Sequence, residues 1–585
     1  MKKNLAILLL AVAVTALPFI FRQPKSVGSW KEGDPVLVVI SPHIASIRDE
    51  FEQGFSAWHL EHYGQPVRID WRNIGGTTEI MRYLEAEQSA SFKAWWSQTG
   101  HTSAPDSEEA QAALRATDDP DAFTTKIDVF FGGGTYDHGS AARKALTARI
   151  WPEGEEPVGI VRDANGNETF PAARGGEDLR NGIYYSAVLS TFGICYNFDR
   201  LRDLGIDHPP ALWSDLADPR YYGQIGVTDP TKSGSIAKAF EMIVHSECLR
   251  AVHEAGFDRA AIQDMEKALS AGGSGETSPD LRRYQAAVEK GWFNGIALLQ
   301  LIGANARYFT DGASKVAIDV SSGDAAAGVS IDFYARVQAD VTRAPDGTER
   351  MGFTTPAGGS SVSGDPISVI RGAPHRELAN RFVQYVLSPD GQKLWNYRVG
   401  EPGGPVKYAL RRLPILREFY PAGAFGGSGA EQGSSNGLNG GSGAEQGSSN
   451  GLNGGSGAEP PAIVKEHALH TSDPLTDPTV DAYALSGTFD YVARWTGRHF
   501  SFFRLLVRAM CMDAGPELKS AWCAIQAAGG PEACPEAMAA LRRLPPGLTW
   551  ADSPAIAKGN AMDLSREWTL FFRDSYAEAQ KLATP

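Results

Sequence analysis

Apolar and polar positions follow two alternating periods from residue 35 to residue 134 of this chain. An apolar run follows Pro35 (VLVVI), apolar and charged residues alternate from Val67 (VRIDW), and a third run spans residues 126–131 (KIDVFF). All three patterns are typical of strands. Between these runs, in residues 47–64 and 78–87, apolar residues recur every three or four positions, as on one face of a helix. Strands that alternate with helices at this spacing predict parallel β/α/β units.

The stretch at residues 213–235, WSDLADPRYYGQIGVTDPTKSGS, predicts a loop, a buried strand and the start of a helix in succession. Its strand is the short apolar run 225–227, which the turn-forming pair Asp229 and Pro230 ends. The helical run SIAKAFEMIV follows, and the hydroxyl residues at its start are Thr231, Ser233 and Ser235. A helix start offers unpaired backbone N–H groups that can hold an anion, although an ordinary N-cap explains the same residues.

The rest of the chain up to residue 425 predicts two α/β lobes. Residues 183–197 (IYYSAVLSTFGICYN) form a long apolar strand that we expect to cross between the lobes. The chain returns to the first lobe with PISVI and the helix ELANRFVQYVLS. We therefore expect a first lobe of residues 36–195 and 336–425 and a second lobe of residues 196–335.

A repeated segment separates these lobes from the end of the chain. Between residues 426 and 459 the sequence GGSGAEQGSSNGLN occurs twice and GGSGAE begins a third copy. Such Gly-, Ser- and Asn-rich sequence cannot bury a core, which predicts a flexible linker. Residues 460–585 predict a mainly helical extension, and we expect it to fold back and cap the first lobe.

The N-terminal segment predicts export. Lys2 and Lys3 precede an apolar run from Leu5 to Phe21, so residues 1–24 are expected to be a signal peptide or an uncleaved anchor in the inner membrane. The formal net charge of −14 argues against nucleic acid as a partner.

The five cysteines show no C-x-x-C spacing, which argues against a zinc or redox site of that type. Cys523 and Cys534 bracket a predicted turn between two helices. These two are expected either to form a disulfide or to remain free thiols.

Several separated motifs resemble the type 2 periplasmic solute-binding proteins of ABC importers, the group that includes ferric-iron, thiamine, phosphonate and sugar-phosphate binders. The resemblance covers about residues 36–420. It rests, besides the 213–235 stretch, on VVISPH (38–43), IDVFFGG (127–133), VLSTFGICYN (188–197), GDAAAGVSIDFY (323–334) and SVSGDPISVIRGAPHRELANRFVQYVLSPDGQKLW (361–395).

The resemblance implies a periplasmic binding protein, monomeric and not an enzyme, that closes two lobes by hinge motion on a small solute and delivers it to an ABC permease. The rival reading is an exported enzyme on the same scaffold, but the sequence contains no H-E-x-x-H motif, and G-x-S-x-G occurs only inside the repeat linker, at residues 433–437 and 447–451. A third reading makes the protein a ligand-sensing receptor that acts on a partner through the helical extension.

Two kinds of solute fit the resemblance, and ferric iron is the first. In the ferric-iron members a histidine, a carboxylate and two tyrosines hold the metal, and the matching positions here offer His43, Tyr334 and Asp332. The carboxylate after the third strand is missing, because that motif reads Gly132-Gly133. Hard oxygen ligands are what ferric iron prefers, so the set is incomplete.

An anionic or phosphate-bearing organic solute is the second. Glycine and hydroxyl residues at the ends of strands expose backbone N–H groups that suit a phosphate or carboxylate. The candidates are Gly76, Thr77, Gly133, Gly134, Thr231, Ser233 and Gly234. Tyr136, Tyr184 and Tyr185 are more readily core residues than ligand contacts, and His138 beside Asp137 is expected in a solvated loop.

Overall fold

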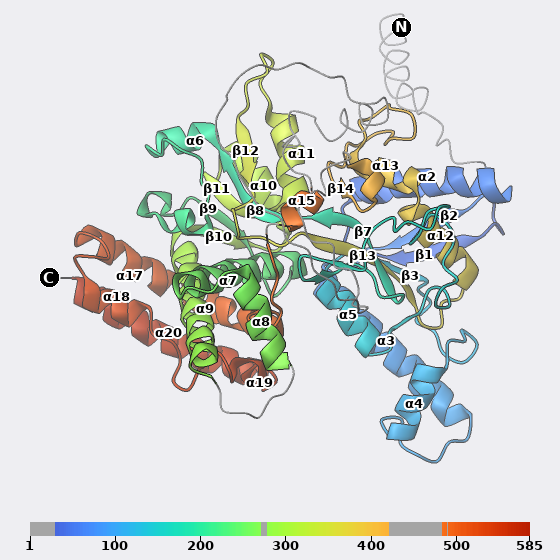
Figure 1. Ribbon diagram of the computed structural model, residues 1–585, viewed down its shortest axis with the longest axis horizontal. Helices are drawn as coiled ribbons and strands as arrows, with labels where there is room; N and C mark the ends of the chain where they lie inside the picture. Colours follow the sequence, from blue (N-terminus) through green and yellow to red (C-terminus); the bar gives the residue numbers. More distant parts are fainter. Residues whose placement is uncertain (1–29, 271–277, 421–481, 488, 585) are drawn as a thin grey trace, which may run out of the picture.

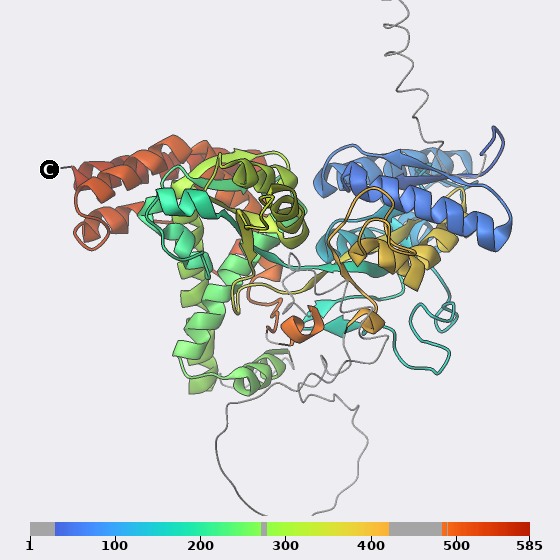
Figure 2. The ribbon, with the colours of Figure 1, turned by 90° about the horizontal axis from the view of Figure 1, so that it is seen from above.

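The computed structural model describes residues 30–270, 278–420, 482–487 and 489–584. These residues form two α/β lobes that lie side by side, with a group of helices attached to one of them (Figures 1 and 2). The predicted signal or anchor, the repeat linker and the first part of the extension lie outside the described residues. Within the described ranges no helix has the length and apolar character to cross a membrane.

The first sheet has a parallel core. β1 (Val36–Ile40) pairs in parallel with β2 (Arg68–Arg72) and with β3 (Val129–Phe131), as the sequence predicts. The order along the sheet is β14-β7-β13-β3-β1-β2, and the added strands are β7 (Tyr184–Ser190), β13 (Ser363–Ile370), β14 (Leu413–Pro414) and β4 (Thr147–Ala148), which pairs with β13. Its helices are α2 (Ala45–Tyr63), α3 (Thr77–Gln98), α4 (Glu108–Ala116), α5 (Thr135–Arg143), α12 (Arg376–Leu387) and α13 (Pro389–Asn396).

The second sheet repeats this arrangement in the order β10-β9-β11-β8-β12. β9 (Ile225–Thr228) lies between its parallel partners β10 (Ala306–Thr310) and β11 (Ala327–Ile331). β8 (Phe192–Asn197) and β12 (Met351–Thr354) are antiparallel; β12 and most of β8 lie outside the limits 196–335 expected for this lobe. The helices are α6 (Phe198–Asp203), α7 (Gly234–Glu254), α8 (Arg259–Ser270), α9 (Pro279–Asn305), α10 (Ala313–Ser322) and α11 (Asp332–Thr342).

Two segments cross between the lobes, and residues 183–197 form the first, as the sequence predicts. β7 belongs to the first sheet and β8 to the second, and Thr191 alone separates them. The second crossing runs back from β12 to β13. The two crossings touch where the second one begins, since the hydroxyl oxygens of Thr191 and Thr355 lie 3.1 Å apart.

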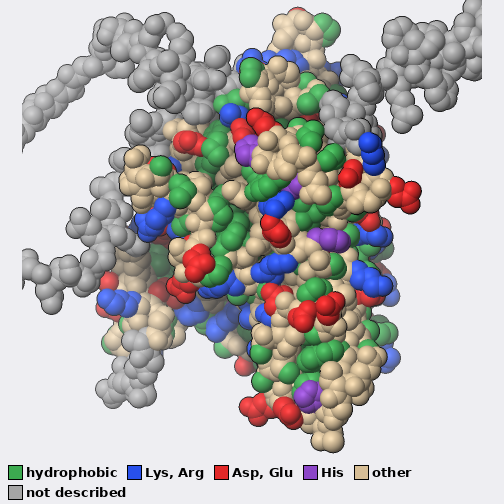
Figure 3. All heavy atoms as spheres, turned by 90° about the vertical axis from the view of Figure 1, so that its right-hand side faces the viewer, with side chains coloured by type: hydrophobic (Ala, Val, Ile, Leu, Met, Phe, Trp, Pro, Cys, Tyr) green, Lys and Arg blue, Asp and Glu red, His purple; other side chains and the backbone are tan. Residues whose placement is uncertain are grey.

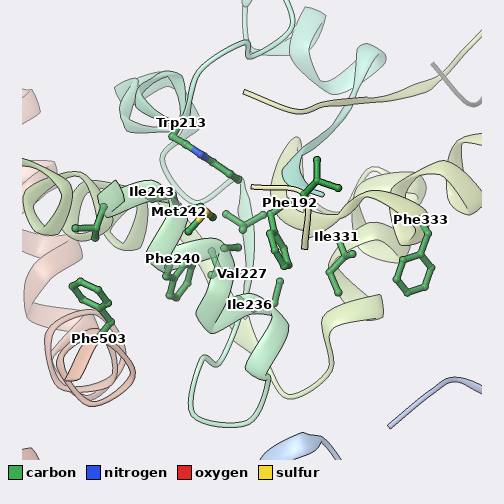
Figure 4. Packing of buried hydrophobic residues seen from close by; sticks show 14 of the residues in the cluster. Phe192, Trp213, Val227, Ile236, Phe240, Met242, Ile243, Ile331, Phe333 and Phe503 are labelled. Carbon is green, nitrogen blue, oxygen red and sulfur yellow. The ribbon is translucent and has the colours of Figure 1, made fainter. Parts of the chain in front are cut away.

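The core of the second lobe is built where α7 covers the sheet. Phe240 and Ile236 of α7 pack with Val227 of β9 and Phe192 of β8 (Figure 4). α9 approaches α7 closely because Gly291 faces its backbone; a Cβ there would lie 2.3 Å from Cys248 Cα.

Most of the described C-terminal extension packs on the second lobe, and not on the first lobe as predicted. The helix at residues 500–507 lies against α7 and the helix at residues 515–527 lies against α9 (Figure 1), and Phe503 joins the same buried cluster (Figure 4). The short helix at residues 482–486 packs instead on the first lobe, where Arg174 Nε donates to Ser486 Oγ at 3.2 Å. Trp522 Nε1 donates to Asn305 Oδ1 at 2.9 Å. The described helices are α15 (Ala482–Ser486), α16 (Phe500–Val507), α17 (Gly515–Ala527), α18 (Pro535–Leu541), α19 (Ser553–Ile556) and α20 (Ala561–Ala583).

The two cysteines considered for a disulfide, Cys523 and Cys534, are both free thiols. Cys523 is exposed, and the thiol of Cys534 contacts the carbonyl of Ala528 at 3.8 Å. The alternative of free thiols is therefore the one that the structure shows.

Candidate functional site

A cavity of about 730 Å³ lies between the two lobes. It opens at the carboxyl ends of the parallel strands, where ligands of open α/β sheets are bound. Three strands reach it from each lobe, β1, β2 and β3 from the first and β9, β10 and β11 from the second. The residues that follow these strands and line the cavity are Pro42, Asn73, Gly133, Lys232, Asp311 and Phe333.

Four helices begin at the cavity wall. α3 and α5 come from the first lobe, and α7 and α10 come from the second. Their N-caps are Gly76, Gly134, Ser233 and Gly312, and only Ser233 caps its helix with a side chain. The first-turn N–H groups and the positive ends of the helix dipoles therefore favour an anion from both sides of the cavity.

Close contact between these loops shows that the lobes are closed on each other. A Cβ on Gly76 would lie 2.4 Å from the carbonyl oxygen of Lys232 in the opposite lobe. A Cβ on Gly234 would lie 2.7 Å from Thr77 Oγ1 and 2.8 Å from Asp137 Oδ2. Because the atom that faces Gly76 belongs to the backbone, glycine is required at that position for the lobes to meet.

A buried charged cluster forms the wall of the cavity near the crossing strands. Asp365 Oδ2 lies 3.2 Å from His43 Nε2 and 2.6 Å from Arg412 Nη2, and the same guanidinium donates to Ser190 Oγ at 2.8 Å. Arg412, only 2% exposed, also lies over the Phe333 ring. Burial favours a raised pKa of Asp365, but the charges of Arg412 and His43 hold that pKa well below its usual range.

Of the three residues expected to hold ferric iron, His43 and Tyr334 line the cavity and Asp332 does not. Asp332 is buried outside the cavity lining, and its Oδ1 accepts from the backbone N–H of Phe333. Burial raises the pKa of the Tyr334 phenol to about 12. In the described part of the chain, no three His, Cys, Asp or Glu side chains come together as a metal-binding group.

The missing carboxylate of the iron pattern has a structural reason. Gly132 has φ +98°, and a Cβ there would lie 2.6 Å from the His43 ring. A side chain at this position would therefore displace His43 from the Asp365 and Arg412 cluster.

Most of the residues expected in the site surround the same cavity. Those that line it are His43, Gly76, Thr77, Gly133, Gly134, Ser233, Gly234 and Tyr334. Thr231 does not, because its hydroxyl donates to Asp229 Oδ1 at 2.6 Å and its carbonyl accepts from Arg504 at 2.7 Å. That these residues contact a solute stays a prediction.

Several lining residues were not expected from the sequence. Lys238 lies 3.0 Å from a carboxylate oxygen of Glu177 and 3.2 Å from one of Glu241, and its Nζ lies over the Tyr491 ring. These side chains come from α7, a short hairpin and the extension, so no local pattern joins them. Asp365 could have been noticed in the sequence, because it is an acidic residue inside a strand-like motif. No sequence pattern marks Arg412.

The expectation of a solvated loop for His138 is wrong. Its ring is fully buried, with Nδ1 2.5 Å from Ser368 Oγ and Nε2 3.1 Å from the Gly132 carbonyl oxygen. Tyr184 and Tyr136 line the cavity, whereas Tyr185 belongs to the core.

Buried His138 predicts loss of stability in mild acid. Burial lowers its pKa from 6.5 to about 4, so between these values the unfolded chain binds a proton that the folded chain does not. Stability is then lost as pH falls, by about 1.4 kcal/mol per pH unit for this one group. We expect His138→Gln to flatten the dependence of the unfolding free energy on pH between 6.5 and 4.5, measured by urea denaturation.

The control for this experiment is His208→Gln, which removes an exposed histidine of the second lobe. An identical pH slope in wild type, His138→Gln and His208→Gln contradicts the prediction.

The outer face of the first lobe shows acidic and basic side chains interspersed with apolar ones (Figure 3). That face has no continuous basic surface of the kind that nucleic acid requires.

Two hinged lobes, closed over a cavity at their carboxyl-terminal strand ends, define a binding protein of the type 2 periplasmic class. Residues 156–410 match the family of bacterial extracellular solute-binding proteins. The chain carries a solute-binding domain of that family, which confirms the resemblance found in the sequence. By its description, that family consists of extracellular proteins that bind a solute.

Individual relatives are distant. The phosphoglycerate transport regulatory protein PgtC of Salmonella typhimurium is 24% identical over 210 residues, which are 36% of this chain and 40% of PgtC. An uncharacterized protein of Haemophilus influenzae is 36% identical over 64 residues, 11% of this chain and 18% of that protein. The chain thus spans less than half the length of either of these curated relatives.

Among solved structures, the periplasmic binding protein AfuA from Actinobacillus pleuropneumoniae is 15% identical. Its TM-score is 0.42, over 65% of this chain and 85% of that chain. By their names, the matched family and this structure are binding proteins.

Proposed function

We propose that this protein captures an anionic or phosphate-bearing organic solute by closure of its two lobes and delivers it to an ABC permease. The observation that carries the proposal is the convergence of four helix N-termini on one cavity, two from each lobe. An anion held between them is bound by both lobes, so binding and closure are coupled.

Cationic side chains support an anionic solute. Arg143 and Arg498 line the cavity, and neither forms an ion pair with a carboxylate in the described part of the chain. Lys232 also lines it, paired with Asp311 at 2.7 Å. The carboxylates of Glu177 and Glu241 lie at another part of the wall, where they suit hydroxyl groups of an organic solute.

The same geometry supports ferric iron less well. Arg412 Nη1 lies 3.4 Å from His43 Nε2, the nitrogen nearest to Asp365. A trivalent cation on His43 and Tyr334 would thus meet a fixed positive charge. We therefore prefer the organic anion to iron as the solute.

Ligand sensing is a second candidate, and one observation favours it. PgtC, with which the chain shares 24% identity over 210 residues, is by name a regulatory protein of phosphoglycerate transport. Deletion of the gene distinguishes the two roles. Loss of solute uptake supports delivery, whereas normal uptake with loss of a transcriptional response supports sensing.

The proposal is tested by a thermal-shift and native-mass screen of the full chain. The probes are inorganic phosphate, 3-phosphoglycerate, a hexose 6-phosphate, a phosphonate, thiamine and its phosphates, and ferric iron with carbonate. We expect a phosphorylated or phosphonate probe to raise the melting temperature, since a ligand at 100 times its Kd adds about 2.7 kcal/mol.

The variant Arg143→Gln removes one cation of the cavity wall. We expect it to weaken binding of the same probe. Stabilisation by ferric iron alone, or by none of the phosphorylated or phosphonate probes, contradicts the proposal.

A further inference from the structure

The C-terminal extension supplies part of the cavity wall. Five of its residues line the cavity together with residues of both lobes: Tyr491, Ala493, Gly497, Arg498 and Phe500. The extension therefore does more than cover α7 and α9, because residues 491–500 reach the cavity between the lobes.

Buried polar contacts fix this part of the extension to the second lobe. Thr496 donates to Glu241 at 2.9 Å, and the backbone N–H of Val492 donates to His245 Nε2 at 3.0 Å. Trp495 Nε1 lies 3.1 Å from the Tyr284 hydroxyl. Because these partners lie on α7 and α9, residues 492–507 move with the second lobe when the cleft opens, whereas the N–H of Tyr491 donates to the first-lobe carbonyl of Gly175 at 2.9 Å.

The same segment also touches the first lobe, at the starts of α5 and α3. The ring of Phe500 lies 4.4 Å from the ring of Tyr136, and Ser501 Oγ lies 3.2 Å from the Tyr136 hydroxyl. The Arg504 guanidinium donates to Thr78 Oγ1 in the first lobe.

Arg504 also donates two hydrogen bonds to the second lobe, so its side chain connects the two lobes. Its Nε donates to the carbonyl of Pro230 at 2.8 Å, and its Nη2 donates to the carbonyl of Thr231 at 2.7 Å. Opening of the cleft keeps the two carbonyl bonds, which lie within one lobe, and breaks the bond to Thr78.

Arg498 is placed to meet the solute. Its guanidinium lies 4.7 Å from the centre of the Trp550 ring, and its Nε donates to His499 Nε2 at 3.3 Å. Neither partner is a carboxylate, and in the described residues the Arg498 guanidinium forms no ion pair, although Glu266 acts on its charge from a greater distance. A guanidinium so placed is suited to bidentate binding of a phosphate or carboxylate.

We propose that the extension is a latch and third wall of the solute cleft. Phe500 and Arg504 hold the first lobe against the second in the closed form, and Arg498 contacts the anionic group of the solute. The role of Arg498 rests on the proposed function, whereas the latch does not.

The latch is tested by the distance between the lobes in the full chain without added solute. Spin labels attached through unnatural amino acids at Glu61 on α2 and Arg202 on α6 report this distance by double electron–electron resonance. Arg504→Gln and Thr78→Val each remove the bond across the cleft, the second without any change in the extension. We expect both to move a larger fraction of molecules to the longer distance.

The control is Arg543→Gln, which breaks an exposed pair with Glu578 on the extension, outside the cavity lining. It is expected to leave the distances as in wild type. Distances that are the same in Arg504→Gln, Thr78→Val and wild type overturn the latch, and so does a wild type found only in the open form.

Arg498 is tested by isothermal titration with inorganic phosphate and 3-phosphoglycerate. We expect Arg498→Gln to bind the better probe about 10- to 100-fold more weakly, the range for loss of a hydrogen bond to a charged group, with interlobe distances unchanged. Unchanged affinity overturns its role. If the wild type binds neither probe, the role of Arg498 falls with this assignment of the solute, while the distances still decide the latch.

Discussion

Replacement of Arg412 by Met is expected to lower the free energy of unfolding by about 3–5 kcal/mol, the usual cost of removing one partner of a buried ion pair. The change leaves the Asp365 carboxylate with one hydrogen-bond partner, His43, in a buried wall. It also removes the donor to Ser190 and the cation that lies over Phe333. Urea denaturation of the full chain, followed by tryptophan fluorescence, measures the loss.

The matched control is Arg350→Met, which breaks an ion pair with Asp199 that is more than one-third exposed on both sides. We expect this change to cost no more than about 1 kcal/mol. Addition of Asp365→Asn to Arg412→Met should restore part of the lost stability, because it removes the unpaired charge. A loss in Arg412→Met no larger than in Arg350→Met contradicts the assignment of a buried, compensated cluster.

Gly76→Ala is expected to prevent full closure of the lobes and to weaken solute binding about 10- to 100-fold. The backbone of Gly76 has φ −77° and ψ 178°, which alanine adopts without strain, so the open protein should fold normally. In the closed form the new Cβ would lie 2.4 Å from the carbonyl oxygen of Lys232. Relief of such overpacking costs about 1–3 kcal/mol.

Titration with the phosphorylated probe that stabilises the wild type measures the affinity, and spin-label distances between α2 and α6 measure closure. Gly515→Ala is the control, since a Cβ there meets no atom within 4 Å. Wild-type affinity together with wild-type distances in Gly76→Ala would show that the contact between these loops is not needed for binding.

The fold was predictable where its signals are local. The periodic runs between residues 35 and 134 place β1, β2 and β3 in one parallel set, and the unbroken apolar run 183–197 predicts a crossing strand. The position of the extension was not predictable. The apolar faces of its helices do not indicate which part of the fold they contact. The helices α7 and α9, which they cover, lie far away in the sequence.

The candidate site follows the same division. Gly76, Gly134 and Ser233 were found because a helix start has a local pattern of residues. The pairing of Asp365 with Arg412 was missed, because it depends on two charges that only the folded sheet brings together. Thr231 was assigned to the cleft by its place in a turn, but the extension occupies its carbonyl.

The crossing at Thr191 restricts the geometry of opening. β7 and β8 are tied into different sheets on either side of this single residue, and its hydroxyl meets Thr355 on the second crossing. Torsion angles at one residue permit the lobes to rotate but leave no spare chain length for them to separate along a line. The angle of rotation, and not a variable gap, therefore sets the largest solute that both walls can grip at once.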